Sequence, residues 1–372
     1  MKMEEKFGLK VELSEEQRKR KAELLSAPVE AVDLIKARGV SELVEAYGKS
    51  SVQARNIGKC AEVYKNMLLD KDRPTILLGI AGPLIAGGLR KVLHDMIEFG
   101  IVDAVVSTGA ILYQDLYQAR GYKHYKGTPE ADDIELRNLL IDRIYDTYVD
   151  EEKFWDCDTF VAKFAEKLES KPYSSREFLY LLGKELKDEN SILYTAAKHG
   201  VPVFSPALND SSIGIGLTQY YHWRKMNGKQ RMILDAIRDN YELTQIVVKS
   251  KKTAAIYIAG GVPKNFINDA VVMAYVFGMD TGGHAYAFQL TADAPQWGGL
   301  SGSTLKEATS WGKISKKATR ATAYVEPTVS LPLVAGHVLQ DGSWKGRGRL
   351  VFDWDGDVLK SIKQGGLVSK KG

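Results

Sequence analysis

Residues 75–88, TILLGIAGPLIAGG, set the fold class, because a short apolar run passes directly into a glycine-rich turn. Apolar residues at helical spacing follow between 89 and 97, and a second short run, IVDAVVSTG, occupies residues 101–109. A strand, a small-residue turn, a helix and another strand form the repeating unit of a parallel sheet with crossover helices. We therefore predict an α/β fold with a Rossmann-like, mostly parallel sheet flanked by helices.

The same alternation resumes further along the chain. Short apolar runs predict four more strands, at residues 201–204, 253–259, 284–290 and 320–325. Between the two halves, residues 114–198 are polar and aromatic, and we predict a helical insertion there, with one face marked by Leu136, Leu140, Ile141, Ile144 and Tyr145. Residues 71–372 are predicted to form one α/β domain, since no repeat or linker divides them.

Residues 1–70 are predicted to form an N-terminal helical segment. Ser14 and Gln17 have the spacing of a capping box, which begins a helix. Apolar residues then recur at roughly helical spacing, namely Leu34, Ile35, Val40, Leu43 and Val44. The pattern leaves open whether this segment is an arm or part of the core.

Charge and composition exclude several classes of function. The net charge is +4, from 51 basic and 47 acidic residues. The longest basic run, residues 18–21, has glutamates beside it and is typical of a solvated helix face, so no nucleic-acid partner is expected. No run reaches the roughly 18 apolar residues of a membrane span. The two cysteines, Cys60 and Cys157, suit the reducing cytoplasm, which we predict as the location.

No metal site is predicted. The six histidines show no ligand spacing. Asp353, Asp355 and Asp357 imitate the start of a calcium loop, but Gln364 stands where the closing glutamate is required. A hairpin turn explains these aspartates better.

Several predicted strands end in turns of small or hydroxyl residues: 82–88, 107–109, 205–212 and 260–261, with a similar loop at 301–303. Ligands of open parallel sheets bind beyond the carboxyl ends of the strands, and glycine lets backbone N–H groups approach a phosphate. A dinucleotide is therefore plausible, although the G-x-G-x-x-G fingerprint is absent and tight turns need glycine for backbone reasons alone. Asp210 in such a turn could bind a ribose hydroxyl or a substrate ammonium, or it could cap the next helix.

The segment EATSWGKI, residues 307–314, carries the most chemistry. A lysine forms an imine only through its neutral amine, which requires burial or nearby cations. Trp311 could give Lys313 an apolar wall, Gly312 would leave room for a ligand, and Glu307 could bind a cationic substrate. The plain alternative is a surface lysine next to a tryptophan.

These segments together resemble the deoxyhypusine synthase family. The specific matches are PVFSPALND at residues 202–210, GGVPK at 260–264, SGS at 301–303 and SWGKI at 310–314. Looser similarity extends from about residue 75 to residue 338. The WGGLSG sequence at 297–302 is similar to a divergent bacterial branch, some of whose members make homospermidine or related polyamines.

The resemblance implies a homotetramer that binds NAD and a polyamine such as spermidine, with active sites at subunit interfaces. NAD would take a hydride beside the donor's secondary amine, and Lys313 would then hold the aminobutyl group as an imine until an acceptor amine takes it. The implied substrate residues are Glu307 and Trp311, with Asn265 at the position of the family's proton-transferring histidine. The implied cofactor residues are Gly82, Thr108, Asp210, Ser212, Gly260, Gly261, Ser301 and Glu326.

Some positions depart from the family pattern. Ile215, Trp297 and Leu300 replace substrate-binding acids, Gln114 replaces a glutamate, and Pro83 replaces an asparagine. Because carboxylates bind the ammonium groups of a polyamine, their loss removes much of that recognition. The likeness to the divergent branch favours a small amine as acceptor. A protein lysine as acceptor and a non-catalytic NAD- or polyamine-binding homologue remain the alternatives. His284, Tyr286 or a water could replace the histidine in proton transfer.

Overall fold

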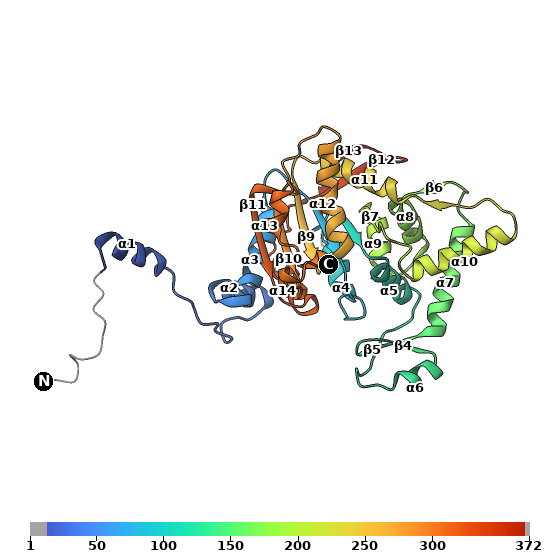
Figure 1. The fold of residues 1–372 in the computed structure, drawn as a ribbon, viewed down its shortest axis with the longest axis horizontal. Helices are drawn as coiled ribbons and strands as arrows, with labels where there is room; N and C mark the ends of the chain where they lie inside the picture. Colours follow the sequence, from blue (N-terminus) through green and yellow to red (C-terminus); the bar gives the residue numbers. More distant parts are fainter. Residues whose placement is uncertain (1–12, 369–372) are drawn as a thin grey trace.

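Six apolar runs form one wholly parallel sheet in the computed structural model, which describes residues 13–368 (Figure 1). The strand order is β11-β10-β9-β1-β2-β7, so the chain reverses its direction of winding after β7. The predicted α/β fold with a parallel sheet is confirmed. The strands are β1 (Thr75–Ile80), β2 (Ala104–Ser107), β7 (Val203–Phe204), β9 (Thr253–Ile258), β10 (His284–Leu290) and β11 (Ile314–Ala323).

The central strands are apolar throughout because helices cover both faces of the sheet. In β1, Ile76, Leu78 and Ile80 face one hydrophobic cluster, whereas Leu77 faces the other. Helices on the first face are α3 (Val52–Leu69), α4 (Arg90–Glu98), α9 (Ile192–His199) and α14 (Pro327–Gln340). Helices on the second face are α11 (Ala236–Lys249), α12 (Gly261–Val276) and α13 (Leu305–Ser310).

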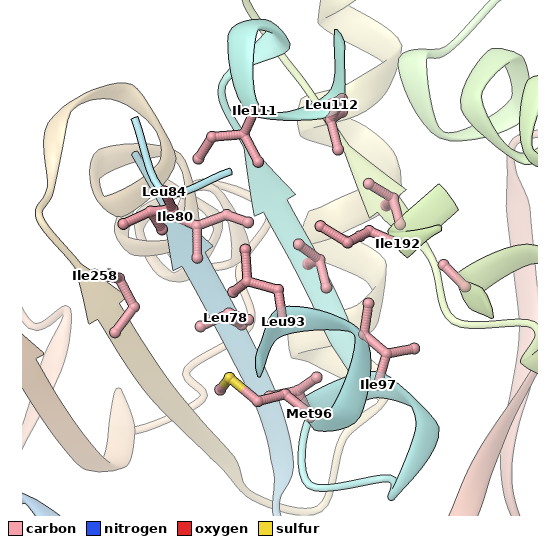
Figure 2. Close-up of a cluster of buried hydrophobic side chains, with 14 of the residues drawn as sticks. Leu78, Ile80, Leu84, Leu93, Met96, Ile97, Ile111, Leu112, Ile192 and Ile258 are labelled. Carbon is pink, nitrogen blue, oxygen red and sulfur yellow. The ribbon is translucent and has the colours of Figure 1, made fainter. Parts of the chain in front are cut away.

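Helix α4 shows how the sequence pattern builds the first face. Figure 2 shows Leu93 and Met96 lying over Leu78 of β1, with Ile192 of α9 in the same cluster. Leu93, Met96 and Ile97 are each at most 1% exposed. Complete burial of such a side chain contributes about 1.5–3 kcal/mol, so the three together hold α4 against the sheet.

The N-terminal segment is an arm followed by two packed helices. α1 (Glu15–Leu24) begins at the predicted capping box, in which Ser14 Oγ accepts from Gln17 N and Gln17 Oε1 accepts from Ser14 N. α1 buries no residue and lies away from the body of the protein (Figure 1). α2 (Val40–Lys49) packs against α3 and α14.

The helix expected through Leu34 and Ile35 is wrong. Residues 25–39 contain only turns and irregular chain, and the two side chains are 71% and 89% exposed. Pro28 lies in this stretch, and it lacks the N–H that a continuing helix needs. The part of the segment formed by residues 1–12 lies outside the described residues.

The region 114–198 is less helical than predicted. α5 (Gly109–Ala119), α6 (Asp133–Asn138), α7 (Glu151–Glu166) and α8 (Ser175–Glu185) accompany α9, but β3 (Tyr125–Lys126), β4 (Ile141–Ile144) and β5 (Thr147–Asp150) form a small antiparallel sheet. The proposed helix face from Leu136 to Tyr145 is therefore wrong. Leu140 and Tyr145 have φ of 54° and 56°, and an α-helix cannot continue through such residues.

One more helix and two pairs of strands lie outside the main parallel sheet. α10 (Ser212–Met226) packs against α7, and β6 (Pro172–Tyr173) pairs with β8 (Ile233–Leu234). β12 (Gly348–Asp355) and β13 (Val358–Leu367) form an antiparallel hairpin whose turn is Gly356 and Asp357, as the aspartate pattern predicted. No helix among residues 13–368 has both the length and the apolar character to cross a bilayer.

Candidate active site

The predicted cofactor residues all follow the carboxyl ends of strands, at one edge of the sheet. Gly82 follows β1, Thr108 follows β2, Asp210 and Ser212 follow β7, Gly260 and Gly261 follow β9, Ser301 follows β10, and Glu326 follows β11. Parallel strands end at the same edge, so residues from 82 to 326 are brought to one region. Three of the following helices, α5, α10 and α12, begin there, and the first N–H groups of a helix have no partner within the helix.

Close contacts connect these turns to one another. A Cβ on Gly260 would lie 2.5 Å from Ser301 Cα, so the turns after β9 and β10 touch through a glycine. A Cβ on Gly109 would lie 2.4 Å from Ser211 Oγ, which brings the starts of α5 and α10 together. Gln114 Oε1 accepts from Ala86 N at 3.1 Å and so fixes the glycine-rich turn after β1 to α5.

For two of the predicted cofactor residues, Asp210 and Glu326, the structure shows whether they cap the helix that follows. Ser211, not Asp210, caps α10, because Ser211 Oγ accepts from Gly214 N. The capping alternative for Asp210 is therefore wrong, and its side chain is exposed. Glu326 caps α14 by accepting from Thr328 N at 2.8 Å. Thr328 in turn lies against Gly87, which places Glu326 near the turn after β1.

Lys313 lies between α13 and β11, with its side chain 15% exposed. Its Nζ lies 3.2 Å from Asp269 Oδ1 and 3.4 Å from Asn265 Oδ1, and 5.5 Å from the centroid of the Trp311 ring. Asn265 Nδ2 donates to Asp269 Oδ2 at 2.9 Å, which closes a triangle of three side chains. Trp311 is 68% exposed, so it covers the amine from one side only.

Gly312 is favoured by the backbone conformation and not by a steric contact. Its φ is 70°, a conformation that side chains rarely adopt, and a Cβ there would meet nothing within 4 Å. The space beside Gly312 is open, and a ligand at this place stays a prediction.

Glu307 has a structural role in this arrangement. With Thr304 it forms the capping box that begins α13, since Glu307 N donates to Thr304 Oγ1 at 3.0 Å and Thr304 N donates to Glu307 Oε2 at 3.3 Å. The side chain is exposed, so its second carboxylate oxygen still faces solvent and stays accessible to a cation.

Two important residues, Lys264 and Asp269, received no role in the sequence interpretation. Lys264 is 1% exposed, and its Nζ donates to Gln289 Oε1 at 2.9 Å and to Ser303 O. Burial lowers the pKa of Lys264 to about 8; Glu307 raises it and the charge of Lys313 lowers it further. Gln289 Nε2 donates to Ala259 O and to Ser301 O, each at 2.7 Å.

Lys264 therefore joins the two halves of the candidate site. It lies one residue before Asn265, which contacts Lys313, and it bonds the 301–303 loop on the cofactor side. A sequence signal for Asp269 existed in the helical spacing: Asp269 is four residues after Asn265, and neighbours at this spacing share a helix face.

The groups proposed to replace the family histidine are held elsewhere. Tyr286 OH donates to Asp70 Oδ2 at 2.9 Å. His284 Nδ1 lies 2.8 Å from Thr253 Oγ1, and burial lowers the pKa of this histidine to about 4. Neither side chain shares a hydrogen bond with the amine of Lys313, although the backbone N of His284 donates to Lys313 O.

A cavity of about 530 Å³ lies apart from these residues, between α8, α9, β7 and the β12–β13 hairpin. None of the predicted site residues lines it. Within residues 13–368, no group of three or more His, Cys, Asp or Glu side chains is arranged to hold a metal ion.

Comparisons with known proteins agree with the resemblance seen in the motifs. The family model for deoxyhypusine synthase matches residues 42–338. A Methanosarcina mazei protein named "Probable deoxyhypusine synthase 2" is 44% identical over 326 residues, which cover 87% of this chain and 93% of that protein. A Chlorobaculum parvum protein named "Deoxyhypusine synthase-like protein" is 43% identical over 339 residues, covering 90% and 95%.

A solved structure from Entamoeba histolytica, described as a candidate deoxyhypusine synthase, has a TM-score of 0.59 at 18% identity. It covers 84% of this chain and 97% of its own. At this identity the likeness shows the shared fold and nothing more. The β12–β13 hairpin lies beyond residue 338, outside the part of the chain that the family model matches.

Proposed function

The chain belongs to the deoxyhypusine synthase family, and from this membership we propose that it is an NAD-dependent transferase acting on polyamines. It would move an aminobutyl-type group from a donor such as spermidine to a small amine, holding the group as an imine on Lys313. Members of the family are typically NAD-dependent aminobutyl transferases. The donor and the acceptor are the specific parts of the proposal.

The observation that carries the proposal is the setting of the Lys313 amine. The amine lies within a largely buried side chain, beside an indole ring, and contacts a carboxylate and an amide. An imine-forming lysine needs a partly desolvated place and a neighbour that can take a proton. A surface lysine beside a tryptophan would not need the triangle with Asn265 and Asp269.

The turns at the carboxyl edge fit a dinucleotide. At Gly82, with φ of 90°, a Cβ would meet no atom within 4 Å, so a ligand can approach the backbone there. The starts of α5, α10 and α12 supply the N–H groups and dipoles that favour phosphates. Bound NAD would accept a hydride from the carbon beside the donor's secondary amine. The acids available for ribose hydroxyls are Asp210 and Glu326.

Exposed apolar residues near the site support self-association. Ile215, Trp297 and Leu300 are 58%, 79% and 41% exposed in the single chain, and Trp311 is 68% exposed. Large exposed apolar side chains mark interaction surfaces. We therefore propose that a second copy of the chain covers the site, within a homotetramer. The two buried free cysteines suit the cytoplasm as its location.

The proposal is tested by reductive trapping. Purified protein is incubated with NAD, spermidine and a diamine such as putrescine, reduced with borohydride, and digested for mass mapping. We expect an aminobutyl adduct on the peptide that contains Lys313, a new polyamine among the products, and neither of them with Lys313→Arg. A wild-type protein that gives no adduct and no product with a panel of polyamines would contradict the proposal.

The alternative acceptor, a protein lysine, is supported by the names of the Methanosarcina relatives. Incubation with labelled spermidine and cell extract distinguishes the two acceptors. Label in one protein band favours a protein lysine, and label in small polyamines favours a small amine. A non-catalytic homologue would bind NAD or polyamine in calorimetry without forming the Lys313 adduct.

A further inference from the structure

The carboxylate of Asp269 is the acidic group that contacts the Lys313 amine. Its Oδ1 lies 3.2 Å from Lys313 Nζ, and its Oδ2 accepts from Asn265 Nδ2 at 2.9 Å. The two side chains of α12 are one turn apart, so they present both functional groups to Lys313 from a rigid helix. Asp269 is 41% exposed, so a substrate can reach the same place.

The other titratable groups around the amine are already engaged. Lys264 is a cation whose Nζ donates to Gln289 and Ser303. His284 faces Thr253 and is neutral at pH 7. Glu307 belongs to the capping box of α13. The amide of Asn265 can hold a proton-transferring group in place, but it has no basic atom of its own.

We propose that Asp269 is the catalytic proton acceptor for Lys313 and the counter-ion of the imine formed there. This inference rests on the transferase function proposed above. It assigns to an aspartate the proton transfer that the family performs with a histidine at the position of Asn265. Asn265 becomes a positioning residue, because its amide orients the carboxylate.

The exchange of protons balances through Asp269. The carboxylate takes a proton from the Lys313 ammonium, and the neutral amine attacks the carbon of the oxidised donor, forming a C–N bond. The C–N bond to the departing nitrogen then breaks, and its electron pair stays on that nitrogen. In passing from ammonium to protonated imine, the Lys313 nitrogen loses two protons, and the departing nitrogen gains the same two and leaves as an ammonium. The hydride has left the donor carbon for NAD before this step.

Asp269 then faces a positive charge both before and after the exchange. Lys313 is an ammonium at the start and a protonated imine at the end, at the same nitrogen. An opposite charge within about 4–6 Å favours the charged form, so the carboxylate stabilises both states. The arrangement accounts for the pairing of Asn265 with an acid one turn later.

The experiment measures the chemical reactivity of the Lys313 amine and the formation of its imine in wild type, Asp269→Asn and Asp269→Glu. The first is the rate at which trinitrobenzenesulfonate modifies Lys313 at pH 8, without NAD or polyamine, followed by peptide mass mapping. Loss of the carboxylate should raise the neutral fraction of the amine, so we expect Asp269→Asn to react about three- to tenfold faster. The second is borohydride trapping with NAD and spermidine, which should fall at least about tenfold in Asp269→Asn and recover partly in Asp269→Glu.

Asp353→Asn in β12 is the matched control, because Asp353 is exposed and lies outside the candidate site. It should leave both readouts unchanged, and thermal unfolding should confirm that every variant is folded. Unchanged Lys313 reactivity in folded Asp269→Asn overturns the inference, as does trapping at the wild-type rate. If the wild type traps nothing but Asp269→Asn still reacts faster, the transferase proposal and the catalytic role fail, while Asp269 stands as the partner of the Lys313 ammonium.

Discussion

The buried cation Lys264 should make the stability of the protein depend on pH in a way that one substitution removes. Burial lowers its pKa from 10.5 to about 8. At 1.36 kcal/mol per unit, a shift of this size corresponds to about 3 kcal/mol. The folded-state pKa lies below the unfolded one, so the unfolded chain binds the proton more tightly. The free-energy cost of burying the charged Lys264 amine is therefore complete below pH 8, and it disappears as the pH rises from 8 to 10.5.

Lys264→Met keeps the length of the side chain and removes the charge. The substitution also leaves Gln289 Oε1 and Ser303 O without a donor, at about 1–3 kcal/mol each. Those losses do not vary with pH, whereas the cost of the buried charge does. Relative to wild type, the variant should therefore lose about 3 kcal/mol of stability between pH 7 and pH 10.5.

Urea unfolding of both proteins at several pH values and constant ionic strength measures this difference. Lys316→Met, at an exposed position of β11, controls for the loss of a lysine as such. A difference between wild type and Lys264→Met that stays flat, within about 1 kcal/mol from pH 7 to pH 10.5, would refute the reasoning, because a solvated or permanently charged Lys264 would produce that result.

Three other predictions concern single contacts. Asp103→Asn should cost about 3–5 kcal/mol in urea unfolding, because Asp103 is 3% exposed and its loss of charge leaves Arg347, with a side chain 2% exposed, unpaired. Burial raises the pKa of Asp103, but the charges of Arg347 and Arg73 outweigh burial and hold this pKa below its usual value. The wild type should therefore lose the stability that the charged Asp103 contributes as the pH falls. In Asp103→Asn the free energy of unfolding should change less with pH in the acid range. Gly260→Ala should weaken NAD binding by about 5- to 150-fold in calorimetry. The added Cβ would lie 2.5 Å from Ser301 Cα, and forcing the two turns apart costs about 1–3 kcal/mol. An unchanged affinity would show that this turn does not take part in binding NAD. Trp311→Ala should slow reductive trapping on Lys313 by about two- to fivefold, as expected for an exposed cation–π contact of about 0.5–1 kcal/mol, while Trp311→Phe should retain most of the rate.

The parallel sheet could be predicted because most of its strands are short apolar runs bounded by turns of small or hydroxyl residues. Both faces of β1 are buried, so its residues are apolar without alternation, and the sequence shows this directly. The region around residues 136–150 was misread for the opposite reason. Spacings such as those of Leu136, Leu140 and Ile144 fit one face of a helix and also fit a half-buried hairpin, and only the backbone at Leu140 and Tyr145 distinguishes them.

An irregularity that no sequence pattern reveals follows Lys313 directly, at the beginning of β11. His284 pairs with Ile314 and Tyr286 pairs with Thr319, so β11 contains three more residues than β10 over the same interval. The extra residues, within 315–318, break the alternation of the strand, which is why only residues 320–325 were predicted as β11. Because α12 starts at the carboxyl edge after Gly260 and crosses back along the sheet, its second turn approaches the beginning of β11, where Lys313 lies. The motif around Lys313 therefore identifies the amine, whereas its contact with Asp269 follows from the path of a helix that begins 52 residues earlier in the chain, counting from Gly261 to Lys313.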